Sequence, residues 1–403
     1  MPQPNLRPSA ASSDAPEPGA ATIVVLFEAL SLVLAEDGGA FAFDGAVEKR
    51  HARAIWTWLA RDVAPELLGS AGPDFDVETL AAMAPVLVER AQGVIASVRH
   101  GSDAELRLKS QIGGGVVWDR LPVALTALKS LPLLARAAAF GRAVNAIEDD
   151  DGVLTALESV PRREGRLSAL LMMAAVGQVL APGRLVLAAT GLAGGEAEAA
   201  LERAGFGPLL DAILAQAQNL VPVVRQTGTF ADIDLVCRAV ERFHHLVYPV
   251  LTYVELDHPG PRRERIGTLV RLVSNELEPR LRQLTSDISR ALRQGRDGID
   301  RLDADSLLAA LNGVYLLGVV RDCRGSLALN EAFDEAWARA GETLEFHLTR
   351  TMDRLRASPG DTVLAERLAS GIKMAEIRFG ADYAEALRAG RAALNRRLAS
   401  AAG

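Results

Sequence analysis

Residues 262–292 read RRERIGTLVRLVSNELEPRLRQLTSDISRAL, and this stretch decides the fold class. Its apolar residues recur at steps of three or four: Ile266, Val270, Val273, Leu277, Leu281, Leu284, Ile288 and Leu292. This spacing places them on one face of an α-helix, which turns once in about 3.6 residues. Pro279 interrupts the pattern, and an interior proline loses a backbone hydrogen bond and clashes with the preceding turn. The stretch predicts a long amphipathic helix that Pro279 kinks or splits.

The same period recurs along most of the chain. In Val77–Val98 the apolar residues again step by three or four, and Asp76 is a plausible N-cap because its carboxylate can accept a hydrogen bond from the first turn. Glycine and proline pairs such as Gly72-Pro73 and Pro359-Gly360 separate the periodic segments. Further helices are expected at about 44–64, 104–112, 119–146, 166–181, 196–203, 207–225, 230–248, 303–320, 330–356, 361–378 and 382–399.

Composition points to the same fold class. Hydrophobic residues make up 49% of the 403 residues but aromatic residues only 5%, so alanine and leucine, which favour helices, dominate the apolar set. We find no alternating strand pair and no hairpin turn between apolar runs. The sequence predicts an all-α protein, an irregular multi-helix array that is either α-solenoid-like or two packed helical bundles. We assign residues 22–226 to an N-terminal helical domain and residues 227–403 to a C-terminal one.

Three segments bear on processing and membranes. Residues 1–21 contain almost no large apolar side chain, so they cannot offset the entropy of ordering and are expected to form a disordered arm. Thr22–Ala35 resembles the apolar part of a signal peptide, but Glu28 lies in its middle, which favours a first amphipathic helix. Leu167–Leu192 is the most apolar stretch, and Pro182 breaks it short of the roughly 20 residues that a spanning helix needs. We predict two buried helices there and no membrane span.

Charge and cysteine usage bear on the class of binding partner and on the cellular compartment. The net charge of −7 argues against nonspecific binding of nucleic acid, which requires basic patches to neutralise phosphates. Cys237 and Cys323 stand alone without CxxC spacing, so a reducing compartment, the cytoplasm, fits best. The cationic neighbours of Cys323 could lower the pKa of its thiol. The preference for arginine over lysine suggests a GC-rich bacterial genome.

Three Glu-x-x-His pairs are candidates for metal binding: Glu48/His51, Glu241/His244 and Glu255/His258. At this spacing both side chains lie on one face of a helix, as in helical di-metal carboxylate proteins. We take Glu241, His244, Glu255 and His258 as the candidate metal ligands. Pro249 lies between the two pairs, and they could face each other only if the chain turned sharply there. Otherwise His244 is a buried side chain and Glu255–His258 a solvated helix end.

Two charged clusters allow further interpretations. Glu148–Asp151 fits a calcium loop except that Ile147 occupies the first ligand position, and it fits a magnesium-binding aspartate motif except that Val153 and Leu154 stand where a carboxylate is needed. The simpler interpretation is an acidic entry to a helix, with Asp151 as a possible N-cap. The basic group Arg262–Arg265 lies at a helix start, where positive charge is disfavoured. It could meet an acidic partner or form a solvated turn.

Three hypotheses for function remain. The first is a non-catalytic helical scaffold or adaptor that binds a protein partner and needs no cofactor, because helical arrays present extended surfaces. The second is a helical enzyme, with or without a bound metal, that uses the Glu-x-x-His pairs or the acidic cluster at residues 148–151. The third is a protein exported without a cleaved signal peptide, with residues 1–21 as the export signal. No motif identifies a catalytic set, so the first hypothesis is preferred.

Overall fold

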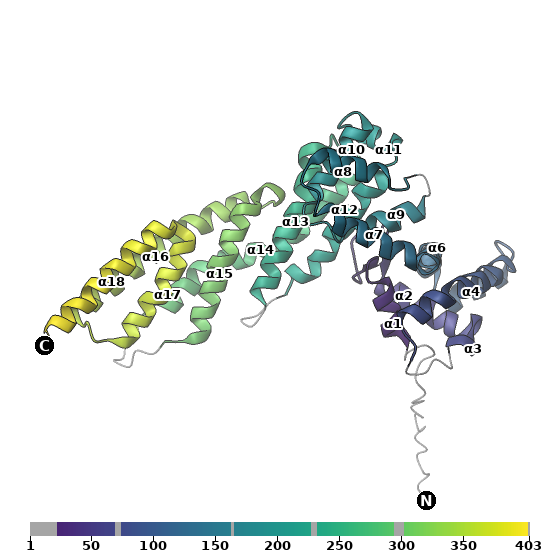
Figure 1. Ribbon diagram of the computed structural model, residues 1–403. Coiled ribbons are helices and arrows are strands. Elements are labelled where there is room, and N and C mark those ends of the chain that lie inside the picture. Colours follow the sequence, from purple (N-terminus) through teal and green to yellow (C-terminus); the bar gives the residue numbers. More distant parts are fainter. Residues whose placement is uncertain (1–21, 69–73, 163–164, 227–231, 294–301, 402–403) are drawn as a thin grey trace, which may run out of the picture. The chain divides into compact units, whose positions relative to one another are not determined.

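The computed structural model describes residues 22–68, 74–162, 165–226, 232–293 and 302–401 (Figure 1). Helices make up most of this part of the chain, which confirms the all-α, multi-helix prediction. The two strands, β1 (Leu34–Ala35) and β2 (Val47–Glu48), have two residues each and pair in parallel. The arm predicted at residues 1–21 lies outside the described residues.

The chain forms two compact units that interleave along the sequence. The first comprises residues 1–143 and 163–178, and the second comprises residues 144–162 and 179–403. The helices on either side of the domain boundary predicted after residue 226 pack against each other inside the second unit. The division into folding domains at 22–226 and 227–403 stays a prediction.

The first unit is built from short helices around an apolar core. The indole of Trp56 donates a buried hydrogen bond of 2.9 Å to Thr22, and Arg120 donates to the backbone carbonyls of Phe43 and Ala46. The elements besides the strands are α1 (Ile23–Leu30), α2 (Lys49–Trp58), the π-helix η2 (Leu59–Val63), α3 (Pro65–Leu68), α4 (Val77–Ala96), α5 (Asp103–Ile112), α6 (Gly115–Lys129), α7 (Leu131–Val144) and α9 (Arg166–Val176).

The second unit contains the longer helices. The elements are α8 (Asp150–Glu158), α10 (Pro182–Ala193), α11 (Glu198–Arg203), α12 (Gly207–Val224), α13 (Ile233–Tyr253), α14 (Pro261–Leu292), α15 (Ala304–Cys323), the 3-10 turn η3 (Arg324–Ser326), α16 (Asn330–Ala357), α17 (Thr362–Phe379) and α18 (Ala381–Ala401). Within this unit α14 packs against α12, α15 and α16, while α17 packs against α15, α16 and α18 (Figure 1). This arrangement buries the apolar face predicted from residues 262–292, including Leu277, Leu281 and Leu284.

Proline does not split the long helix of the second unit. α14 runs as one helix of 32 residues through Pro279. Pro279 and Asn275, whose carbonyl loses its partner at that proline, are both exposed, so water can solvate the freed carbonyl. A proline on the solvent side is therefore tolerated in this helix.

Among the described helices, Ala304–Ser326 is long and apolar enough to cross a membrane by length and composition, and half of its apolar window is buried against the rest of the chain. The pair α6 and α7 passes the same test together but is bent by 76°. Core helices of proteins outside membranes also have these properties. The predicted break in Leu167–Leu192 is confirmed, because α9 and α10 are separate helices.

Candidate functional site

His244 lies on α13 and contacts the turn after α15. Its Nδ1 is 3.0 Å from the hydroxyl oxygen of Ser326, and its ring stacks on Tyr248 with centroids 4.8 Å apart. The Ser326 hydroxyl donates to the carbonyl of Cys323 at 3.1 Å, so His244 supplies the proton of the first contact. Ser326 is 1% exposed. A serine that is buried and already donating its proton is not placed to act as a nucleophile. The contact between His244 and Ser326 instead joins α13 to η3.

Burial and the charge of His245 lower the pKa of His244 below the ordinary histidine value. The unfolded chain therefore takes up a proton at a pH where the folded chain does not, and stability falls as the pH drops below about 6.5. We expect the His244→Gln variant to lose less unfolding free energy than the wild type between about pH 7.5 and about pH 5.5. Urea unfolding at both pH values measures this difference.

In His244→Gln the loss of unfolding free energy at low pH should be smaller than in the wild type but not zero, because burial also lowers the pKa of His51 and of His347. His100→Gln is the matched control, since the side chain of His100 is 97% exposed. An equal pH dependence in wild type and His244→Gln would contradict the expectation.

The two cysteines lie near Glu241 in the interior of the second unit. Burial, followed by the charge of Glu241, raises the pKa of Cys237 and of Cys323 to about 12. The hypothesis that Arg321 and Arg324 lower the pKa of the Cys323 thiol is therefore wrong. Both thiols are buried and protonated at neutral pH, which does not suit nucleophilic catalysis.

The Glu255/His258 pair does not lie on a helix. α13 continues through Pro249 and ends at Tyr253, so Glu255 and His258 belong to the segment between α13 and α14. There the Glu255 amide donates to the carbonyl of Glu196 at 2.8 Å. The Glu255 carbonyl accepts from the Glu198 amide at 3.0 Å. The helical spacing that motivated this pair is absent.

Within the described residues no three His, Cys, Asp or Glu side chains come together in a way that could hold a metal ion. The predicted set of Glu241, His244, Glu255 and His258 is therefore not assembled in this part of the chain.

The acidic cluster at residues 148–151 starts α8. Asp149, rather than Asp151, is the N-cap, and its carboxylate accepts a hydrogen bond of 2.5 Å from the Gly152 amide. Arg184 of α10 donates to the carbonyls of Ile147, Glu148 and Asp149 and pairs with the Asp150 carboxylate at 3.1 Å. An N-cap and a bridging arginine account for this cluster as a helix entry that is fixed to a neighbouring helix.

Arg262 is buried rather than solvated. It is 8% exposed at the start of α14 and pairs with Glu198 at 2.8 Å, with Asp211 at 3.0 Å and with Glu202. Burial acts to lower the pKa of Arg262, but its bonds to Asp211 and Glu202 outweigh burial and raise it. The interpretation of this arginine as part of a solvated turn is wrong, because its side chain is buried against carboxylates. Those partners lie 51 to 64 residues earlier in the chain, so the local sequence does not show them.

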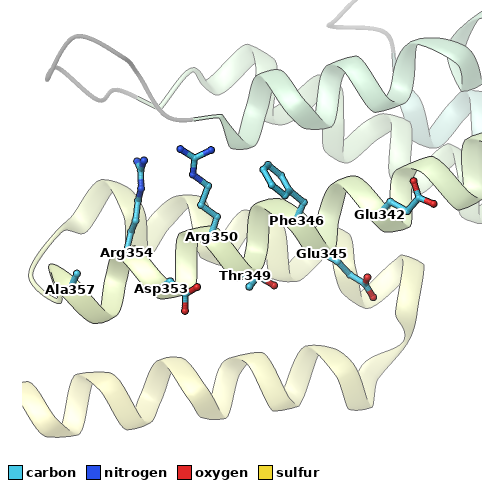
Figure 2. Close-up of a pocket in the computed structure, with 8 residues that line it drawn as sticks. All are labelled: Glu342, Glu345, Phe346, Thr349, Arg350, Asp353, Arg354 and Ala357. Carbon is cyan, nitrogen blue, oxygen red and sulfur yellow. The ribbon is translucent and has the colours of Figure 1, made fainter.

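The outer face of α16, which carries the exposed ring of Phe346, is a candidate binding surface. A hollow of about 830 Å³ lies over it, and eight of the described residues, at helical spacing, line the hollow: Glu342, Glu345, Phe346, Thr349, Arg350, Asp353, Arg354 and Ala357. Figure 2 shows Phe346, Arg350 and Arg354 projecting from the same side of the helix. Phe346 is 59% exposed. A large aromatic side chain in the middle of a hollow surface is typical of a binding site.

This face is not predicted from the sequence, because its residue pattern is that of a solvated helix side. Phe346 was the one signal, since it breaks an otherwise polar stripe. Searches of protein families, curated proteins and solved structures find no match to this chain.

Proposed function

We propose that this protein is a non-catalytic helical scaffold that binds a protein partner through the outer face of α16. The observation that carries the proposal is the exposure of Phe346, at 59%, within the hollow. Covering an aromatic ring removes apolar surface from water, and aromatic anchors supply much of the binding energy at protein interfaces.

The charges of this face specify what the partner must carry. Glu342 and Glu345 lie on the N-terminal side of Phe346, and Arg350 and Arg354 lie on its C-terminal side. Asp353 pairs with Arg356 at 2.7 Å, so it offsets little of the positive end. The partner needs a helix with positive charge opposite the glutamates and negative charge opposite the arginines.

A second copy of this chain meets that requirement when its α16 runs antiparallel. With the two-fold axis midway between Phe346 and Arg350, Glu342 faces Arg354 of the second copy and Phe346 faces its Arg350. The first pairing is an ion pair and the second a cation–π contact. Such a contact is isologous, the commonest kind in homo-oligomers. We therefore commit to a second copy as the partner.

Analytical ultracentrifugation of the full chain tests the proposal. We expect a concentration-dependent dimer that Phe346→Ala weakens at least about tenfold, since truncating a central anchor typically costs ~2 kcal/mol or more. Leu308→Ala removes an apolar side chain that is 40% exposed on α15 and should leave the dimer unchanged.

Charge reversal distinguishes this antiparallel pairing from nonspecific self-association. Glu342→Arg should weaken the dimer because it places two arginines opposite each other, and adding Arg354→Glu should restore it. Asp334→Arg, an exposed change elsewhere on α16, is the control. A wild-type chain that stays monomeric at all concentrations, or a double variant weaker than the single one, would overturn the second copy as partner.

A further inference from the structure

A second cavity lies in the first unit, and nothing in the proposed function uses it. Its volume is about 620 Å³, within the range of small-molecule sites. Its apolar walls come from four helices: Val88 and Ile95 of α4, Trp118, Leu121 and Leu125 of α6, Leu133 of α7 and Leu167 of α9.

The charged residues that line this cavity are both cations. They are Lys129, the last residue of α6, and Arg166, the first residue of α9, and within the described part of the chain no aspartate or glutamate lines it. Neither cation forms an ion pair within the described residues. Lys109 differs, because it pairs with Glu105 at 3.1 Å and lies over the ring of Trp118. A cation in the first turn of a helix opposes the helix dipole, so Arg166 is in an unfavourable place unless an anion joins it.

Ser130 supplies a second and independent indication of a ligand. It is 7% exposed and lines the cavity, and its hydroxyl makes no hydrogen bond within the described residues. Because this serine lines the cavity, its hydroxyl is free to bond a water or a ligand there. Ser130 also precedes α7, where its carbonyl accepts from the Leu133 amide at 2.9 Å, so the positive end of that helix dipole lies at the cavity.

We propose that this cavity binds a small amphipathic carboxylate, with its apolar body against Leu121, Leu125 and Trp118. The carboxylate lies between Lys129 and Arg166 and accepts a hydrogen bond from Ser130. Two cations that pair with no described carboxylate favour an anion, and the apolar walls favour a chain or ring over a bare inorganic ion. The apolar body gains from leaving water in proportion to the area it buries.

Isothermal titration of the full chain with decanoate, decanol and inorganic phosphate separates these contributions. We expect decanoate to bind with a stoichiometry of one. Decanol should bind at least about tenfold more weakly, because charge-assisted hydrogen bonds contribute about 1.5–3 kcal/mol each. Phosphate should give no measurable heat, because it has no apolar body to bury.

Variants assign the binding to this cavity. The double variant Lys129→Gln/Arg166→Gln should lower decanoate affinity at least about tenfold and leave decanol unchanged. Ser130→Ala should weaken decanoate by a smaller factor. Arg107→Gln/Arg136→Gln carries the same charge change at exposed positions of the first unit and should bind like the wild type.

Three results would overturn the proposal: equal binding of decanoate and decanol, equal weakening by the cavity and control variants, and no decanoate binding at all. Binding to vesicles of anionic lipid without binding to free decanoate would indicate a membrane surface instead and would also overturn it. The α16 dimer is measured separately, so failure of either proposal leaves the other standing.

Discussion

Replacing Arg262 by alanine should lower the free energy of unfolding by about 3–5 kcal/mol, the usual cost of removing one partner from a buried ion pair. Arg262 and Glu198 are 8% and 4% exposed, so water cannot solvate the carboxylate that remains. Glu198 also accepts a hydrogen bond of 3.0 Å from the Asp257 amide, which links the network to the segment before α14. Urea unfolding monitored by circular dichroism measures the loss.

Two further variants show whether the uncompensated charge causes this loss. Arg263→Ala removes the neighbouring exposed arginine and should change stability by less than about 0.5 kcal/mol. Adding Glu198→Gln to Arg262→Ala should recover part of the loss, because the amide carries no charge. If the double variant is as unstable as the two single losses added together, the buried charge is not the cause.

Gly141→Ala should destabilise the first unit by about 1–3 kcal/mol, the range for overpacking a filled core. Gly141 lies on α7 against α9, and a Cβ atom there would meet the carbonyl oxygen of Ala175, with the Ala175 carbonyl carbon at 3.0 Å and Gln178 Cβ at 3.1 Å. Backbone atoms cannot move aside as a side-chain tip can, so the two helices would have to separate.

Gly93→Ala is the matched control. Gly93 lies inside α4, and a Cβ atom there would have no neighbour within 4 Å. Alanine favours the helix over glycine, so this change should stabilise the protein by about 0.5–1 kcal/mol. Thermal unfolding should therefore shift in opposite directions for the two variants, and a shift in the same direction would contradict the close contact between α7 and α9.

The helices could be predicted because their signal is local. The steps of three and four in residues 262–292 describe α14 to within one residue at its start, and Asp76 caps α4 through a bond of 2.8 Å to the Thr79 amide, as predicted. Pro279 does not split α14, because the freed carbonyl faces water, which the sequence of one helix does not show, and the alternative of a kink stays a prediction.

The sites could not be predicted because their partners are distant in the chain. Arg262 looked like part of a solvated turn since Glu198, Glu202 and Asp211 belong to other helices. The Glu255–His258 spacing suggested a helix face, but Glu255 lies in a backbone bridge with Ala197, a partner distant in the sequence. Likewise, Lys129 and Arg166 come to one cavity through the packing of α6 and α9.

The interleaving of the two units determines when each can be completed during synthesis. α9 belongs to the first unit but follows α8, which belongs to the second. Residues 168–176 of α9 are all buried, so a chain released only as far as residue 143 lacks a helix that its core requires. Residue 178 must leave the ribosome before the first unit can close, and by then α8 has emerged ahead of its neighbour α10. No single cleavage point yields both units intact. A premature stop before residue 178 leaves both units incomplete, and a proteolytic cut between residues 145 and 178 divides both of them.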